Sequence, residues 1–450
     1  MQTIIPTIAR AAADLEAGRT TARKLVERAL AAIEAPDGEG ATTFVRTYAA
    51  QARTSADAMD LLRGAGRAPG PLAGIPISIK DLFDVAGEPT AAGSRVLAEA
   101  KPAERHATVI ERVLAAGLIP VGRTNMTEFA FSGLGINPHF GTPRSPWARS
   151  EGRVPGGSSS GAAVSVADGM ALAALGTDTG GSCRVPAAFC GVVGYKPTAR
   201  RVPITGVLPL SPSLDSVGPL ANTVACCAAI DAVLAAEPRR DVAAMELRGM
   251  RLAVPGNMVM EGTEPAVAEA FGRALNRLGN LGVRITHLTF PQFEQIAAAN
   301  AAGGFAAAEA HAWHREFLAD QAEVYDPRVR VRIQRGEAMT AGDLIRLLDA
   351  RRAIIAGMDA ATVPFDAVAM PTTPLVPPRI DALHEDADYT RVNALVLRNP
   401  SLANFLDRCS ISLPAHRRGE APVGFMLMGE TGGDARLFAL AAAIEPILKE

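Results

Sequence analysis

Two serine-rich loops and one lysine are the residues of this sequence whose types and spacing could do chemistry. The stretch VPGGSSSG occupies 154–161 and DTGGSCR occupies 178–184, and the alanine-rich run between them is typical of a helix. The lysine is Lys80, at the end of the apolar run GIPISIK. A serine hydroxyl becomes a nucleophile when a nearby base takes its proton, so the question is which base these loops would use.

A phosphate-binding loop is one interpretation of the first serine-rich stretch. Gly156 and Gly161 have the spacing of glycines whose backbone N–H groups cradle a phosphate. Such a loop continues with Lys and Ser or Thr, whereas Ala162 and Ala163 stand here. The phosphate-loop interpretation is therefore disfavoured.

A nucleophile elbow is the second interpretation, because GSSSG satisfies G-x-S-x-G with Ser159 at its centre. That motif needs a strand leading into the turn, but the preceding SEGRVPG is polar and contains Pro155. It also needs a downstream histidine. None of the available histidines lies in a recognisable catalytic motif; they are His287, His311, His314, His384 and His416.

The third interpretation uses both loops and the lysine. Positive charge in this chain comes almost entirely from arginine, and the only lysines are Lys24, Lys80, Lys101, Lys196 and Lys449. A buried lysine can lose its proton and serve as a base, because an apolar setting lowers its pKa by as much as about 3 to 5 units. Arginine stays protonated and cannot take this role. Lys80, at a strand end, could instead be a surface lysine.

Motifs along nearly the whole chain resemble those of the amidase signature family of serine hydrolases. The run GGSSSG followed by ALGTDTGGSCRVPA resembles the family's serine signature, and GIPISIKDLFDVAG resembles its lysine motif. Further similarities lie in GRTNMTEFAFS, GYKPT, MPTTP and APVGFMLMG. One departure is Cys183, which stands where an aliphatic residue usually follows the signature serine.

The resemblance implies a Ser-Ser-Lys triad. In it, Ser182 attacks the amide carbonyl and forms an acyl-enzyme, Ser158 relays the proton, and Lys80 accepts it and later supports its delivery to the leaving amine. The family also implies a cis peptide between Gly157 and Ser158, and it places the reactive group at Ser182 and not at Cys183.

The nucleophile loop is expected to form an oxyanion hole. Backbone N–H groups of Thr179, Gly180, Gly181 and Ser182 are predicted to converge on the oxyanion, with Ser158 also facing the substrate. Structural roles are expected for the neighbouring polar residues. Ser159 and Ser160 are expected to make hydrogen bonds within the loop, and Asp178 and Arg184 to form an ion pair or hydrogen bonds. Asp215 is expected to hold a turn.

The elements that must hold these loops point to one α/β domain over 1–450. Residues 1–65 are predicted to be helical, 66–235 to form the signature core, and 236–450 to complete the same sheet with a helical insertion at 300–360. The runs 250–256 and 281–288 are predicted strands joined by a helix, a βαβ-like unit. The resemblance implies the amidase signature fold, a large mixed central sheet covered by helices on both faces.

Bulk composition excludes several classes of function. The 450 residues carry a formal net charge of -2, which gives no general attraction to nucleic acid or an anionic membrane. No stretch is predicted to cross a membrane or to be a secretory signal, so a cytoplasmic protein is expected. The five cysteines lack metal-ligand spacing. The family resemblance implies a small-molecule amide as substrate and no metal or organic cofactor, and we expect an assembly compatible with a homodimer.

The substrate is left open by the sequence. Besides a general amidase, the resemblance admits a glutaminase subunit of a tRNA-dependent amidotransferase, a biuret or urea-derivative hydrolase, and a catalytically silent binding protein. The pocket is expected in about 125–145 and 300–380. One arginine-rich helix in the second segment could bind a substrate carboxylate, although a solvated helix face is favoured for it; its arginines are Arg328, Arg330, Arg332 and Arg335.

Overall fold

An eleven-stranded mixed sheet runs through the computed structural model, which describes residues 5–238 and 242–449. Residues 1–4, 239–241 and 450, which belong to the predicted segments 1–65 and 236–450, lie outside the described residues. The strand order is β1-β3-β2-β4-β6-β5-β10-β11-β9-β7-β8. The strands are β1 (Phe44–Thr47), β2 (Pro76–Lys80), β3 (Ile119–Thr124), β4 (Ala173–Thr177), β5 (Val193–Lys196), β6 (Val217–Ala221), β7 (Arg251–Pro255), β8 (Arg284–Leu288), β9 (Ala367–Pro371), β10 (Ser410–Pro414) and β11 (Gly424–Met428).

Parallel pairing places the ends of β2 and β4 side by side. Strand β2 runs parallel to β3 on one side and to β4 on the other, with Ile77 opposite Ala173 and Ile79 opposite Leu175. The carboxyl ends of the two strands therefore meet at one edge of the sheet. These ends carry Lys80 and Thr177.

The predicted βαβ unit is present at the other end of the sheet. Strands β7 and β8 are parallel, and α9 (Pro265–Asn280) connects them. The predicted α/β class with a mixed central sheet is confirmed, because the sheet also contains antiparallel pairs such as β4 with β6 and β10 with β11.

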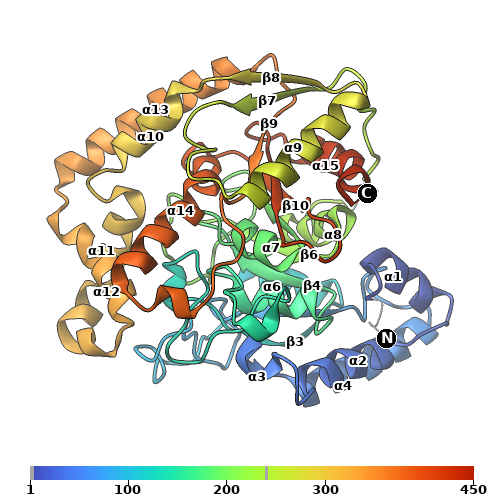
Figure 1. Ribbon diagram of the computed structural model, residues 1–450. Helices are drawn as coiled ribbons and strands as arrows, with labels where there is room; N and C mark the ends of the chain where they lie inside the picture. The colour runs from blue at the N-terminus through green and yellow to red at the C-terminus, as the bar shows by residue number, and fades with distance from the viewer. Residues whose placement is uncertain (1–4, 239–241, 450) are drawn as a thin grey trace.

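Helices cover both faces of the sheet (Figure 1). One face carries α6 (Ser160–Ala167), α7 (Arg184–Cys190) and α14 (Asp386–Phe405). The opposite face carries α5 (Thr108–Ala115), α8 (Val224–Ala235), α9 and α15 (Asp434–Lys449). The serine-rich loops precede α6 and α7, so both loops belong to the first face.

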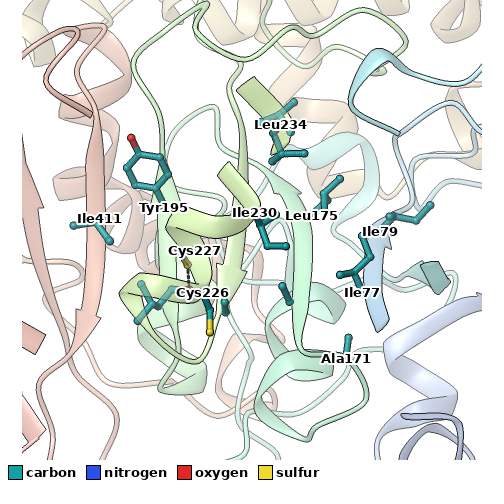
Figure 2. Packing of buried hydrophobic residues seen from close by; sticks show 14 of the residues in the cluster. Ile77, Ile79, Ala171, Leu175, Tyr195, Cys226, Cys227, Ile230, Leu234 and Ile411 are labelled. Carbon is teal, nitrogen blue, oxygen red and sulfur yellow. Dashed lines mark hydrogen bonds between the residues drawn. The ribbon is translucent and has the colours of Figure 1, made fainter. Parts of the chain in front are cut away.

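The core on the second face lies beneath α8, which packs on β6, β5 and β4. Figure 2 shows Ile77 and Ile79 of β2 and Leu175 of β4 in the same cluster as Ile230 and Leu234 of α8. Side chains alternate between the faces of a strand, so Ser78 and Lys80 point to the other face. The hydrogen bond between the hydroxyls of Ser78 and Ser165 of α6, at 2.8 Å, agrees with this alternation.

The alanine-rich run between the serine-rich loops is a helix followed by a strand, and the prediction of a single helix was wrong. Helix α6 ends at Ala167, Gly169 adopts a positive φ of 71°, and the chain then enters β4. Strand β4 is buried throughout, so its apolar residues show no alternation and resemble a buried helix in sequence.

Two further groups of helices also pack against the sheet or its core (Figure 1). The N-terminal group comprises α1 (Ile8–Glu16), α2 (Ala22–Ile33), α3 (Gly40–Thr43) and α4 (Ala49–Gly64). It confirms the helical prediction for most of 1–65. The exception is β1, which adds an edge strand to the sheet. The second group makes the predicted 300–360 segment helical; it comprises α10 (Pro291–Ala299), α11 (Gly304–Gln321), α12 (Pro327–Gln334) and α13 (Ala341–Thr362).

Short 3-10 turns complete the described secondary structure; they are η1 (Glu128–Ala130), η2 (Arg149–Glu151), η3 (Ala322–Val324), η4 (Arg335–Ala338) and η5 (Asp381–Leu383). Within residues 5–238 and 242–449, no helix is both long enough and apolar enough to cross a membrane.

Candidate active site

Lys80 is fully buried and contacts the first serine-rich loop. Its Nζ donates hydrogen bonds to Ser158 Oγ at 2.7 Å and to Thr177 Oγ1 at 2.9 Å. Ser158 lies 78 residues further along the chain, and Thr177 belongs to the neighbouring strand. The interpretation of Lys80 as a surface lysine is therefore wrong, because its exposed fraction is 0%.

Burial lowers the pKa of Lys80 from 10.5 to about 7, while the neighbouring Cys183, Asp178 and Asp215 act in the opposite direction. The cause is the loss of water around the ammonium group, which favours the neutral amine. The isoleucines beside Lys80 in sequence point to the opposite face of β2, so the burial comes from the α6 side. At neutral pH a large fraction of Lys80 is a free amine that can accept a proton.

The loop that carries Ser158 is fixed by neighbouring backbone. The peptide between Gly157 and Ser158 is cis, which confirms the expectation from the resemblance. The Gly157 N–H donates to the Gly133 carbonyl at 2.8 Å, and the Thr127 N–H donates to the Ser158 carbonyl at 3.1 Å. A Cβ on Gly157 would lie 2.5 Å from the nitrogen of Gly135, so only glycine fits this close approach.

The second serine-rich loop lies against the first. The Ser159 N–H donates to the Ser182 carbonyl at 3.3 Å, which places the two loops side by side. Ser182 stands between β4 and α7, and 4% of it is exposed. Among residues 5–238 and 242–449, no hydrogen bond joins the hydroxyls of Ser158 and Ser182. Hydrogen bonds between catalytic groups often tighten only in the substrate complex.

The backbone donors of the predicted oxyanion hole divide into two sets. The Gly181 N–H already donates to Asp178 Oδ1 at 2.8 Å, so its predicted role as an oxyanion donor is not supported. The N–H groups of Thr179, Gly180 and Ser182 have no protein acceptor within the described part of the chain. These same three residues line a cavity. The set of expected donors is therefore narrowed to Thr179, Gly180 and Ser182.

A buried ion pair holds the nucleophile loop. Asp178 and Arg184 are both fully buried, with Arg184 Nη2 at 2.8 Å from Asp178 Oδ1. Burial alone would raise the pKa of Asp178, but the Arg184 guanidinium holds that pKa well below its usual range. Arg184 also donates to the Pro400 carbonyl at 2.8 Å and to Asn404 Oδ1 at 2.7 Å, which ties the loop to α14. The predicted structural role of the pair agrees with these contacts.

The other predicted loop residues also make structural hydrogen bonds. Ser159 Oγ donates to the Thr177 carbonyl and Ser160 Oγ donates to the Asn125 carbonyl, each at 3.3 Å. Asp215 accepts hydrogen bonds from the backbone of its own turn and from Thr179 Oγ1, the latter at 2.5 Å. In the described residues no histidine is hydrogen-bonded to either serine-rich loop, so the geometry does not favour a Ser159 elbow.

Cys183 is not placed to act as a nucleophile. It is fully buried, and burial raises the pKa of its thiol well above the usual value, with the negative charge of Asp178 acting in the same direction. The thiol therefore stays protonated at neutral pH and packs in a small apolar cluster with Ala174 and Leu220.

A cavity of about 180 Å³ opens over Ser182. Both predicted pocket segments contribute to it, 125–145 through residues 130–132 and 300–380 through residues 300, 303–306 and Arg332. Leu397 and Ser401 of α14 add a wall that was not predicted. The prediction of a solvated face is wrong for Arg332, because α12 packs so that this arginine lines the cavity, whereas Arg335 is exposed.

Thr177 is the site residue that sequence reasoning missed. It is the last residue of β4 and the second acceptor for Lys80. A polar residue at the carboxyl end of a buried strand was the available signal, but that signal required knowing that β4 pairs with β2. For metal binding, the described residues hold no group of three or more His, Cys, Asp or Glu that could bind an ion.

The chain is similar in sequence and in fold to known proteins. The family model described as Amidase matches residues 24–438. A 2-amino-5-chloromuconic acid deaminase of Comamonas testosteroni is 38% identical over 408 residues, covering 89% of this chain and 87% of the relative. The A-type subunit of the glutamyl-tRNA(Gln) amidotransferase of Chloroflexus aurantiacus is 34% identical, covering 98% and 96%. A crystal structure of an amidase superposes with a TM-score of 0.88 at 32% identity, covering 98% and 99%.

Proposed function

The chain belongs to the amidase signature family and is a hydrolase acting on C–N bonds, and on that premise we propose that it cleaves a small carboxamide through an acyl-enzyme on Ser182. The observation that carries the proposal is the buried hydrogen bond from Lys80 Nζ to Ser158 Oγ at 2.7 Å, made by a lysine whose pKa is about 7. Lys80 therefore supplies a base for the serine-rich loops, to which no histidine of the described residues is hydrogen-bonded.

Acylation begins with attack of Ser182 Oγ on the carbonyl carbon. The Ser182 proton passes to Ser158 Oγ as Ser158 gives its own proton to neutral Lys80. The carbonyl oxygen becomes an oxyanion, which the N–H groups of Thr179, Gly180 and Ser182 stabilise. When the C–N bond breaks, the proton returns from Lys80 through Ser158 to the leaving nitrogen, and ammonia or an amine departs.

Deacylation repeats the relay with water as the nucleophile. Water gives a proton through Ser158 to Lys80 and attacks the ester carbon. Collapse of the second tetrahedral intermediate breaks the bond to Ser182 Oγ, which regains a proton by the reverse path. The net reaction consumes one amide and one water and yields a carboxylic acid and ammonia or an amine. The cavity of about 180 Å³ favours a substrate with few carbon atoms.

Alanine variants test the assignment. Lys80→Ala, Ser158→Ala and Ser182→Ala should each remove most ammonia release from a panel of primary amides that includes glutamine and biuret, while the proteins remain folded. Ser159→Ala is the matched control and should lose much less. Inactivity of Ser159→Ala together with one histidine variant, with Ser182→Ala still active, would replace this proposal by the elbow mechanism.

Deamination of an amino-substituted acid is the second candidate, favoured by the 38% identity to a 2-amino-5-chloromuconic acid deaminase. Adding that acid to the panel separates the two reactions, because only one of them starts from an amide.

A role as the glutaminase component of an amidotransferase predicts weak activity alone and co-purification with a larger partner. The biuret or urea-derivative alternative predicts preference for biuret. The cytoplasmic location and the homodimer stay predictions.

A further inference from the structure

Arg332 differs from the other arginines of its helical segment. Arg328 donates to Asp386 Oδ1 at 2.8 Å, and Arg330 donates to the Ala322 carbonyl at 2.9 Å. Arg335 is exposed. Arg332 is half-buried and lines the same cavity as Ser182.

The guanidinium of Arg332 lacks an anionic partner. Within residues 5–238 and 242–449 it makes no hydrogen bond or ion pair with the protein, and its Nε is buried without an acceptor. No Asp or Glu is among the residues that line the cavity. Burial lowers the pKa of Arg332 from its usual value, with Tyr389 opposing and Arg335 assisting. Arginine nevertheless keeps its proton at neutral pH, so the cavity holds a positive charge without a counter-charge.

The surroundings of this guanidinium leave its edge available. Its Cζ lies 4.9 Å from the centroid of the Phe131 ring, so one planar side of the group is occupied by a cation–π contact. The N–H donors lie in the guanidinium plane, where they match the two oxygens of a carboxylate. A buried charge without a partner is costly, and a ligand anion would remove that cost.

We propose that Arg332 binds a carboxylate of the substrate, so that the enzyme acts on small molecules bearing a carboxylate a short distance from the C–N bond to be cleaved. This inference rests on the proposed function for the position of the reacting bond at Ser182. Monoamides of short dicarboxylic acids are the simplest members of the class. A single arginine in a cavity of about 180 Å³ suits one carboxylate better than a phosphate dianion.

Matched substrate pairs test the proposal. The monoamides of malonic, succinic, glutaric and adipic acids are each compared with the corresponding methyl ester amide, which has the same chain and no charge. Ammonia release reports only cleavage of the amide. At the chain length that is cleaved fastest, the wild type should have a higher kcat/KM for the acid than for its methyl ester. Arg332→Met should lower the acid-to-ester ratio of kcat/KM by about 10- to 100-fold, the range expected for a hydrogen-bonded charge pair.

Two further variants control the comparison. Arg335→Met makes the same substitution at an exposed arginine of the same segment, and it should leave the ratio unchanged. Arg332→Lys keeps the charge but not the planar pair of donors, and it should recover part of the preference. Because the guanidinium of Arg332 makes no hydrogen bond with the described protein, Arg332→Met should unfold at the wild-type temperature or above it. An acid-to-ester ratio that is equal in wild type and Arg332→Met overturns the proposal.

Binding separates failure of this inference from failure of the proposed reaction. Calorimetry with the Ser182→Ala variant should show tighter binding of the acid than of its ester, and adding Arg332→Met should remove the difference. Suppose that ammonia release depends on Ser182 but the acid-to-ester ratio of kcat/KM is the same in wild type and Arg332→Met. The carboxylate proposal is then wrong and the amidase proposal stands. If no amide of the panel is cleaved but binding of the acids depends on Arg332, the carboxylate proposal stands and the amidase proposal is wrong. Equal binding of acid and ester overturns the carboxylate proposal.

Discussion

Replacing Lys80 with methionine is expected to abolish activity and at the same time to increase stability, by an amount that depends on pH. The side chain is fully buried, and burial lowers its pKa from 10.5 to about 7. Between these two values the unfolded chain binds a proton at Lys80 that the folded protein does not. Wild-type stability therefore rises with pH across this window, and the penalty from Lys80 is largest below pH 7. Methionine fills a similar space without a charge.

The size of the effect follows from the two pKa values. A lowering from 10.5 to about 7 corresponds to a destabilisation of about 5 kcal/mol below pH 7, of which about 2 kcal/mol is left at pH 9. Methionine also loses the hydrogen bonds to Ser158 and Thr177, at about 1 kcal/mol each. Lys80→Met should therefore be more stable than wild type by about 3 kcal/mol at pH 6 and about equally stable at pH 9.

Urea denaturation followed by circular dichroism at pH 6 and pH 9 measures this difference. The cost of the lost hydrogen bonds is the same at both pH values, so the change of about 3 kcal/mol between them reports the titration of Lys80 alone. Lys101→Met, which removes an exposed lysine, is the control and should show no such change. A difference between wild type and Lys80→Met that is the same at pH 6 and pH 9 would refute a lowered lysine pKa.

Three further substitutions and one control substitution probe the parts that hold the site. Thr177→Val should lower kcat about 10-fold with little change in KM, because Thr177 accepts a hydrogen bond from the lysine amine and does not line the cavity; steady-state kinetics measures both. Gly181→Ala should lower the unfolding free energy by about 2–5 kcal/mol, since its Cβ would lie 2.7 Å from a proline ring carbon at a φ of +130°. Gly180→Ala, whose Cβ would have no neighbour nearer than 3.9 Å, is the control and should cost less than about 1 kcal/mol in the same denaturation assay. Asp178→Asn should cost about 3–5 kcal/mol because it leaves the Arg184 charge buried without its counter-charge, and a thermal melt indistinguishable from wild type would contradict that.

Short apolar runs bounded by Gly or Pro allowed part of the sheet to be predicted. The strands β2, β7 and β8 follow such runs, and the 3.6-residue periodicity predicts the helix α9 that joins β7 and β8. These signals are local, because each depends on residues within a single element. Lys80 stood out for the same reason, as one charged residue at the end of an apolar strand.

Elements that depend on tertiary packing were missed. Strand β6 contains Gly218 and Pro219, residues that argue against a strand, yet it lies between β4 and β5 with Pro219 opposite Leu175. Helix α14 contains Pro400, and it is held by contacts such as the hydrogen bond from Arg184 to the Pro400 carbonyl. In both cases packing outweighs the local preference of proline.

The orientation of individual groups at the site was also beyond the sequence. The residues of DTGGS predict a loop rich in backbone donors, but not that the Gly181 N–H turns to Asp178. The arginine content of DPRVRVRIQRG suggested a polar helix face, and only the packing of α12 near Phe131 shows that Arg332 lines the cavity. Both facts depend on segments distant in sequence.

The most direct test of the Ser-Ser-Lys relay is labelling with a fluorophosphonate probe, followed by peptide mapping and measurement of the labelling rate. The probe should modify Ser182, and Lys80→Met should slow the modification by at least about 100-fold, the usual contribution of a general base. Modification of Ser159 or any other residue in place of Ser182, or an unchanged rate in Lys80→Met, would contradict the relay from Ser182 through Ser158 to Lys80.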